Sequence, residues 1–80
     1  MSASRNRRSE AAQKQPQLRS YVRKYRLEKG LTQAELSSAV DVTRQTIISI
    51  EKGNYVPSVL LAMKIARRLS VRVEDLFDYD

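Results

Sequence analysis

The side chains of this 80-residue chain that are best suited to bind a ligand lie within residues 43–52. The guanidinium of Arg44 can donate a two-pronged hydrogen bond to guanine O6 and N7, and the amide of Gln45 can pair with adenine N6 and N7. Hydroxyls for a phosphate or a base, and a methyl surface for thymine, come from Thr46, Ser49 and Ile48. No acidic residue occurs in residues 42–50, so nothing there would repel phosphates. A solvated helix face is the alternative interpretation.

Catalytic and metal chemistry finds little support in the composition. The chain contains neither cysteine nor histidine, which removes disulfides, thiolate metal sites and the usual proton shuttle near neutral pH. The sequence also lacks a nucleophile–base pair and a glycine-rich phosphate loop. We therefore predict no enzyme activity, no catalytic residues, no cofactor and no metal. No stretch approaches the roughly 20 apolar residues that span a bilayer, so no membrane association is expected.

The charge distribution favours a polyanionic partner. Fifteen Lys and Arg against nine Asp and Glu give a formal net charge of +6 and a pI of about 10.1, and net positive charge attracts nucleic acid. Basic residues dominate positions 1–17, whereas positions 74–80 contain acids and no base. A soluble protein whose pI is high by chance remains an alternative on composition alone.

The apolar pattern predicts an all-α domain over residues 17–80. Residues 1–16 contain only methionine and alanine as apolar side chains, so we expect a disordered basic N-terminal arm. Apolar residues recur at helical spacing from Leu18, and Gly30 is placed to end that helix. Four more short helices are expected, three of them begun by the capping residues Thr32, Thr43 and Ser58 and the last over residues 73–77. Nothing alternates with period two, so no strand is predicted.

Residues 33–52 are predicted to form a helix-turn-helix. Two helices of roughly eight residues joined by a very short turn must cross steeply. The second helix then projects from the domain, and its N-terminal residues can enter a DNA major groove about 12 Å wide.

The motifs resemble those of the lambda repressor and Cro-type (XRE-type) helix-turn-helix transcriptional regulators. The matching runs are G-L-T-Q-A-E-L (30–36), V-T-R-Q-T-I (42–47), I-E-K-G (50–53), P-S (57–58) and L-S-V-R-V-E-D-L-F (69–77). The resemblance implies a compact five-helix bundle whose third helix is the recognition helix. This sequence departs from the family pattern at Asp41 and Ser70, where glycine is common, and also at Ser37 and Arg72.

The resemblance also implies roles for individual residues. Contacts to bases or nearby phosphates are implied for Gln33, Thr43, Arg44, Gln45 and Ser49, and contacts to backbone phosphates for Lys52 and Asn54. Arg26 and Glu51 are implied to form a buried ion pair between the first helix and the end of the third. A catalytic or phosphate-binding role is the alternative for that pair.

Five apolar residues of the C-terminal region could form a dimer interface, and two of them, Leu60 and Met63, lie off the main apolar stripe of the fourth predicted helix. The five are Leu60, Met63, Val73, Phe77 and Tyr79; scattered exposure is the alternative. Together the observations predict a cytoplasmic, nucleoid-associated repressor that binds a palindromic double-stranded operator as a homodimer. The competing prediction is a protein-interaction module, such as an antitoxin, that uses the apolar set as its main site.

Overall fold

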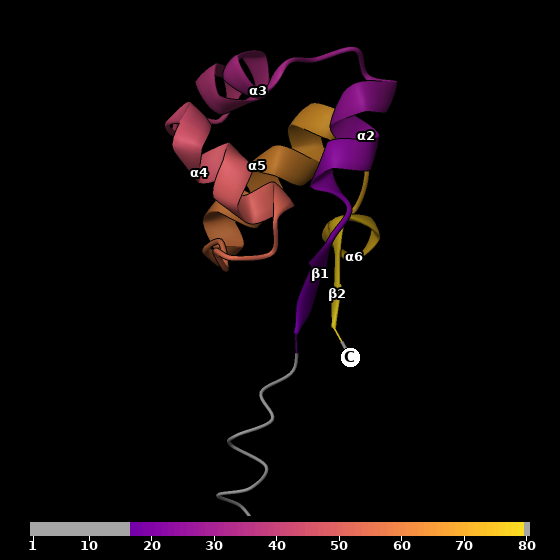
Figure 1. Cartoon of the computed structure of the whole chain (residues 1–80). Coiled ribbons are helices and arrows are strands. Elements are labelled where there is room, and N and C mark those ends of the chain that lie inside the picture. The colour runs from indigo at the N-terminus through magenta and orange to yellow at the C-terminus, as the bar shows by residue number, and fades with distance from the viewer. Residues whose placement is uncertain (1–16, 80) are drawn as a thin grey trace, which may run out of the picture.

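A computed structural model describes residues 17–79. The predicted arm over residues 1–16 and the predicted domain end at Asp80 lie outside these residues. The elements in chain order are β1 (Leu18–Ser20), α2 (Val22–Glu28), α3 (Gln33–Ala39), α4 (Arg44–Glu51), α5 (Val59–Leu69), α6 (Val73–Leu76) and β2 (Phe77–Tyr79). Figure 1 shows α3 and α4 on one side of the molecule, α2 on the other, and α5 behind and between them. The two strands lie side by side below the helices.

The helices begin where the capping residues predict. The Thr32 hydroxyl accepts from the Glu35 amide at 3.0 Å, and the Glu35 carboxylate accepts from the Thr32 amide at 2.8 Å. This reciprocal capping box satisfies two amides that an isolated helix leaves without partners. Thr43 and Ser58 cap α4 and α5 by accepting from the amide three residues further on. Each cap fixes the first residue of its helix.

Within residues 17–79, two non-glycine residues adopt the left-handed backbone conformation at helix ends. Asp41, in the turn between α3 and α4, has φ 63°, and Ser70, after α5, has φ 61°. This conformation costs most residues roughly 1–2 kcal/mol, but Asp can offset part of the cost with its short polar side chain. Both residues stand where the family pattern has glycine, so the turns keep the geometry at some energetic cost.

The core joins α2, α3 and α4 to α5 and α6. Its fully buried side chains are aliphatic and come from α2 to α6: Val22, Leu36, Ile47, Ile50, Ile65, Leu69 and Leu76. Burying a side chain of this size contributes about 1.5–3 kcal/mol. One face of α4 is therefore held against the domain, which leaves its opposite face to solvent.

The prediction of a helix beginning at Leu18 is wrong. Residues 18–20 form β1, and α2 begins only at Val22. The last helix, predicted over residues 73–77, is likewise too long. In the structure α6 ends at Leu76, and Phe77 begins β2. The two strands pair antiparallel, with Leu18 opposite Tyr79. The pairing of two segments that lie far apart in sequence outweighs the local helical periodicity of residues 18–20. All five predicted helices are nevertheless present in the described region.

Candidate nucleic-acid interface

The N-terminal turn of α4 presents polar side chains to solvent. Thr43, Arg44 and Gln45 are exposed, and the next three outward residues (Thr46, Ile48 and Ser49) are half-buried. Ile47 and Ile50, on the opposite face, are completely buried. The arrangement predicted for a recognition helix is therefore present. The hydrogen-bond donors Arg44 and Gln45 lie on the solvent-facing side of α4, and the opposite side of the helix packs on the core.

The hydroxyls of Thr43 and Thr46 lie at the start of α4 and contact each other there. The Thr46 amide donates to the Thr43 hydroxyl at 3.2 Å, and the two hydroxyl oxygens lie 3.0 Å apart. Both side chains thereby stabilise the first turn, and they remain at the surface beside Arg44 and Gln45.

A buried ion pair joins α2 to the last turn of α4. Arg26 Nε donates to Glu51 Oε2 at 2.6 Å, and the side chains are only 7% and 5% exposed. A second guanidinium nitrogen donates to Glu51 Oε1 at 3.2 Å, and the third donates to the Leu31 carbonyl at 2.8 Å. Satisfied in this way, the pair is part of the structure that holds α4 and is not free to act on a ligand.

Gln33 lies at the start of α3 and is half-buried. Its Nε2 donates to Glu51 Oε1 at 3.1 Å, so the amide is engaged with the protein itself. Sequence reasoning expected this residue to contact a phosphate or a base. The hydrogen bond to Glu51 was missed because nothing in the local pattern connects two residues that lie 18 positions apart.

The C-terminal end of α4 abuts the small sheet. Gly53 has φ 79°, and a Cβ built on it would lie 3.0 Å from the Leu18 carbonyl oxygen. Both the backbone conformation and this close approach require glycine. Lys52 and Asn54 flank Gly53 and are exposed, so a cation and an amide stand at the end of the helix.

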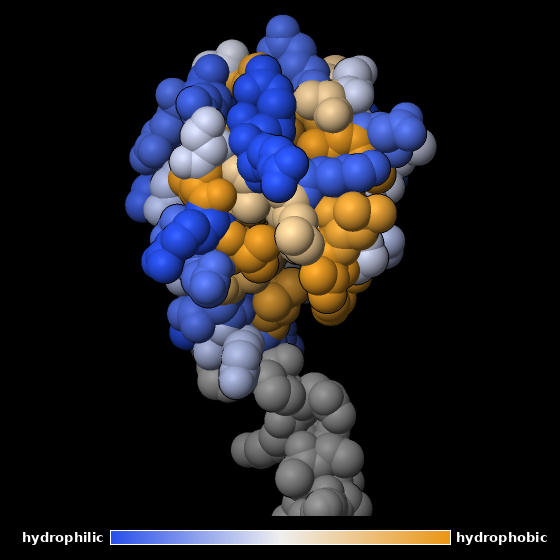
Figure 2. Space-filling model, turned by 180° about the vertical axis from the view of Figure 1, so that it is seen from behind, coloured by the Kyte–Doolittle hydropathy of each residue, from blue (hydrophilic) through white to orange (hydrophobic). Residues whose placement is uncertain are grey.

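The five residues predicted to form a dimer interface fall into two groups. Leu60, Met63 and Tyr79 are 64%, 51% and 67% exposed, and Figure 2 shows hydrophobic side chains gathered on the face behind that of Figure 1. Val73 and Phe77 are half-buried against the core. This second group lines a hollow that sequence reasoning did not anticipate.

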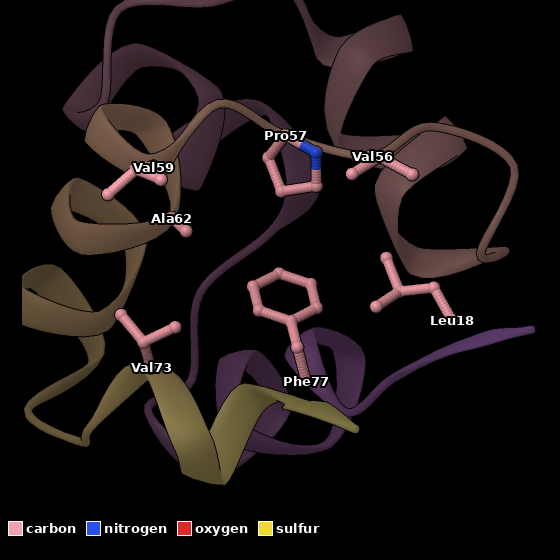
Figure 3. Close-up of a pocket in the computed structure, with 7 residues that line it drawn as sticks. All are labelled: Leu18, Val56, Pro57, Val59, Ala62, Val73 and Phe77. Carbon is pink, nitrogen blue, oxygen red and sulfur yellow. The ribbon is translucent and has the colours of Figure 1, made fainter. Parts of the chain in front are cut away.

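The hollow has a volume of about 190 Å³ and an apolar lining. Figure 3 shows the side chains that surround it, from both strands, α5, α6 and the loop after α4: Leu18, Val56, Pro57, Val59, Ala62, Val73 and Phe77. Val56 and Val59 at its rim are 73% and 77% exposed. The strands that form one wall have no signal in the local sequence, which is why the hollow could not be predicted.

Within residues 17–79, no group of three or more metal-ligating side chains comes together. None of the described helices has the length and apolar character needed to cross a bilayer.

Comparison with known sequences identifies relatives along most of the chain. The family described as Helix-turn-helix matches residues 22–76. An uncharacterised HTH-type transcriptional regulator of Methanothermobacter thermautotrophicus is 53% identical over 64 residues, which cover 79% of this chain and 93% of the relative. A similar regulator of Archaeoglobus fulgidus is 49% identical over 63 residues, covering 79% of this chain and 90% of the relative.

Solved structures show the same architecture. The clp gene regulator ClgR of Corynebacterium glutamicum superposes with a TM-score of 0.64 at 30% identity, over 68% of this chain and 57% of that protein. The restriction-modification controller protein C.AhdI of Aeromonas hydrophila superposes with a TM-score of 0.63 at 26% identity, over 68% of this chain and 82% of that protein.

Proposed function

The chain belongs to the helix-turn-helix family of transcriptional regulators, and on that premise we propose that it binds double-stranded DNA sequence-specifically through α4. The membership confirms the predicted family, the lambda-repressor-like five-helix fold and the prediction that the chain is not an enzyme. The observation that carries the proposal is the exposed, acid-free first turn of α4, whose opposite face is fully buried. A helix held in this way can enter the major groove without rearrangement.

The proposed contacts divide by chemistry. Arg44 and Gln45 contact base edges, where a bidentate pair distinguishes the correct base by about 1–3 kcal/mol. Their neighbours Thr43, Thr46, Ile48 and Ser49 contact flanking bases or phosphates. Lys52 and Asn54 contact backbone phosphates, which fix the orientation of the protein but carry no sequence information.

Two copies are proposed to bind a palindromic operator. The exposed apolar face over α5 and β2 supports this, since a dimer would cover it. The charges support it as well. Helix α5 carries Lys64, Arg67 and Arg68 without an acid, while α6 and β2 carry Glu74, Asp75 and Asp78 without a base. In a two-fold dimer that sets α5 of one copy against α6 and β2 of the other, these opposite charges would meet twice.

The hollow fits the same proposal. Its volume of about 190 Å³ is below the roughly 300–1,000 Å³ that is typical of small-molecule pockets. One apolar side chain from a second copy is a better match than a metabolite. Occupation of a promoter by such a dimer would block transcription, so we propose a repressor that acts in the cytoplasm at the nucleoid.

Selection of bound sites from random duplexes with the purified protein tests the proposal. The expected product is an inverted repeat whose half-site centres lie about 34–36 Å apart. Arg44→Ala should cost about 1–3 kcal/mol and relax the preference at one base pair, whereas the control Lys52→Ala should weaken all duplexes alike and lower the salt slope by about 1. If no sequence is enriched and binding is insensitive to salt, the protein-interaction module becomes the better interpretation.

A further inference from the structure

The first residues that the structure describes lie beside the C-terminal end of α4. The Leu18 carbonyl oxygen is so close to Gly53 that a Cβ built there would lie 3.0 Å from it. The Leu18 side chain also lines the hollow together with Val56 and Pro57, which belong to the loop after α4 (Figure 3). The chain therefore enters the domain next to Lys52, which is exposed and is proposed to contact a backbone phosphate.

The small sheet fixes this point of entry. In the antiparallel ladder, Leu18 lies opposite Tyr79 and Arg19 opposite Asp78. The Arg19 guanidinium also donates to the Asp78 carboxylate at 3.1 Å. Because both strands are held in this way, residues 1–16 are joined to the domain at a defined place, beside the end of the recognition helix.

The sequence of residues 1–16 is suited to an anionic partner. Three arginines occur within four positions, in the run R-N-R-R (5–8), and Lys14 adds a fourth cation against the one acid Glu10. The apolar residues of this segment are methionine and alanine, so it has few side chains that could fill the apolar hollow. A cluster of cations attracts a polyanion instead.

Two anionic surfaces lie within reach of this segment, namely the acids of α6 and β2 and the phosphates of bound DNA. The acids already have cationic neighbours: Asp75 lies 3.6 Å from the Arg72 guanidinium, and Asp78 lies 3.1 Å from that of Arg19. Duplex DNA, by contrast, presents one phosphate charge for about every 1.7 Å of its axis. The charges therefore favour DNA as the partner.

We infer that the N-terminal arm (residues 1–16) binds backbone phosphates next to those contacted by Lys52, through Arg5, Arg7 and Arg8. This inference rests on the proposed function and adds a second contact surface to α4. An extended chain spans at most about 3.3–3.6 Å per residue, so Arg8 can lie roughly 30 Å from residue 17 and Arg5 roughly 40 Å. That reach is about one turn of duplex, 34–36 Å. Phosphate contacts carry no sequence information, so the arm increases the affinity for every duplex alike.

The first test neutralises the three arginines in the full chain, as Arg5→Gln, Arg7→Gln and Arg8→Gln together. Binding to an unrelated duplex is measured between about 50 and about 200 mM salt. Each phosphate contact contributes about 0.9 to the slope of log affinity against log salt, so the slope should fall by about 2–3. Over this range of salt, the wild type should lose roughly forty times more affinity than the variant.

The matched control removes the same charge on and just after α2, as Arg23→Gln, Lys24→Gln and Lys29→Gln together. These residues are exposed, and α2 lies on the other side of the molecule from α4 (Figure 1). The slope of this variant should change by less than about 1. Equal falls in both variants would mean that net charge alone matters, which overturns the inference. An unchanged slope in the arm variant overturns it, and so does a higher affinity, because the arm would then pair with acids of its own chain.

A tethered cleavage reagent tests where the arm lies on the DNA. The chain contains no cysteine, so Asn6→Cys provides one attachment site for an iron chelate, between Arg5 and Arg7. Strand cleavage should concentrate within about one helical turn of the phosphates that Lys52 contacts. Glu28→Cys, at an exposed position of α2, should give no cleavage there. Absence of cleavage from Asn6→Cys, or an equal pattern from both positions, overturns the inference.

The unrelated duplex separates this inference from the proposed function. A steeper salt slope in the wild type than in the arm variant, but not than in the α2 variant, upholds the inference even if no operator is selected. If an operator is selected and Arg44→Ala relaxes one base pair, but the arm variant keeps the wild-type slope, the inference fails while the proposed function stands.

Discussion

Removal of Arg26 tests whether the buried ion pair holds the domain together. Arg26→Met keeps most of the aliphatic stem but removes every guanidinium hydrogen bond. The Glu51 carboxylate, 5% exposed, would keep only the donation from Gln33 at 3.1 Å. The Leu31 carbonyl would lose its bond to Arg26 as well. The substitution therefore leaves a charge in the interior without a counter-charge.

The expected cost follows from that uncompensated charge. Breaking a buried pair by removing one partner costs about 3–5 kcal/mol. Small domains have a total stability of roughly 0.05–0.15 kcal/mol per residue. For 80 residues this is roughly 4–12 kcal/mol, so the loss would be a large share of the free energy of unfolding. Replacing both partners by apolar residues is often neutral, so Arg26→Met with Glu51→Leu should be more stable than Arg26→Met alone.

Urea denaturation followed by far-ultraviolet circular dichroism measures both effects. The control is Arg72→Met, the same substitution at a surface arginine whose side chain is 74% exposed and lies 3.6 Å from Asp75; its effect should be much smaller, because solvent screens exposed pairs. A cost below about 1 kcal/mol for Arg26→Met, no more than an ordinary hydrogen bond contributes, would refute the reasoning. A double variant less stable than the single variant would refute it too.

Two further predictions concern the C-terminal face. Leu60→Glu places a carboxylate where the proposed dimer brings the acids of the other copy, so sedimentation equilibrium should show a shift from dimer to monomer; an unchanged dimer argues against this face. The pKa of Asp78 is lowered from its ordinary 3.8 because the Tyr79 amide, and then the Arg19 guanidinium, donate to its carboxylate. Its contribution to stability is therefore present above pH 3.8 and is lost as the pH falls below that value. The stability difference between the wild type and Asp78→Asn should shrink from about pH 5 to about pH 2, and a constant difference would contradict this cause.

Features set by near neighbours in the chain could be predicted from the sequence. The capping box joins residues three positions apart, and its two hydrogen bonds are present. Gly30, predicted to end the first helix, has φ 71°. In both cases the residue type favours the local geometry, because a hydroxyl at a helix start accepts from a free amide and a glycine at its end adopts a positive φ without steric cost.

Features that join distant segments could not be predicted from local patterns, and the one long-range contact that was expected, between Arg26 and Glu51, came from the family resemblance. Leu18 fits a helical stripe, but in the structure it pairs with Tyr79, at the other end of the described chain. Gln33 is expected to contact DNA at the start of a helix, and nothing in the local sequence indicates that its amide also donates to Glu51. No periodicity or motif encodes either pairing, since each depends on where the packed core brings the two chain segments together.

The two ends of α4 differ in the contacts that hold them, so substitutions at the two ends should affect DNA binding differently. The C-terminal end is fixed from three sides: by Arg26 on α2, by Gln33 on α3 and by the β1 backbone against Gly53. The N-terminal end carries Arg44 and Gln45 on an exposed turn. A change at the fixed end disturbs the packing of the whole helix, so it should affect all base positions together. Changes at the exposed end remove one contact and should affect one position, so the pattern of lost preferences reveals at which end a substitution acts.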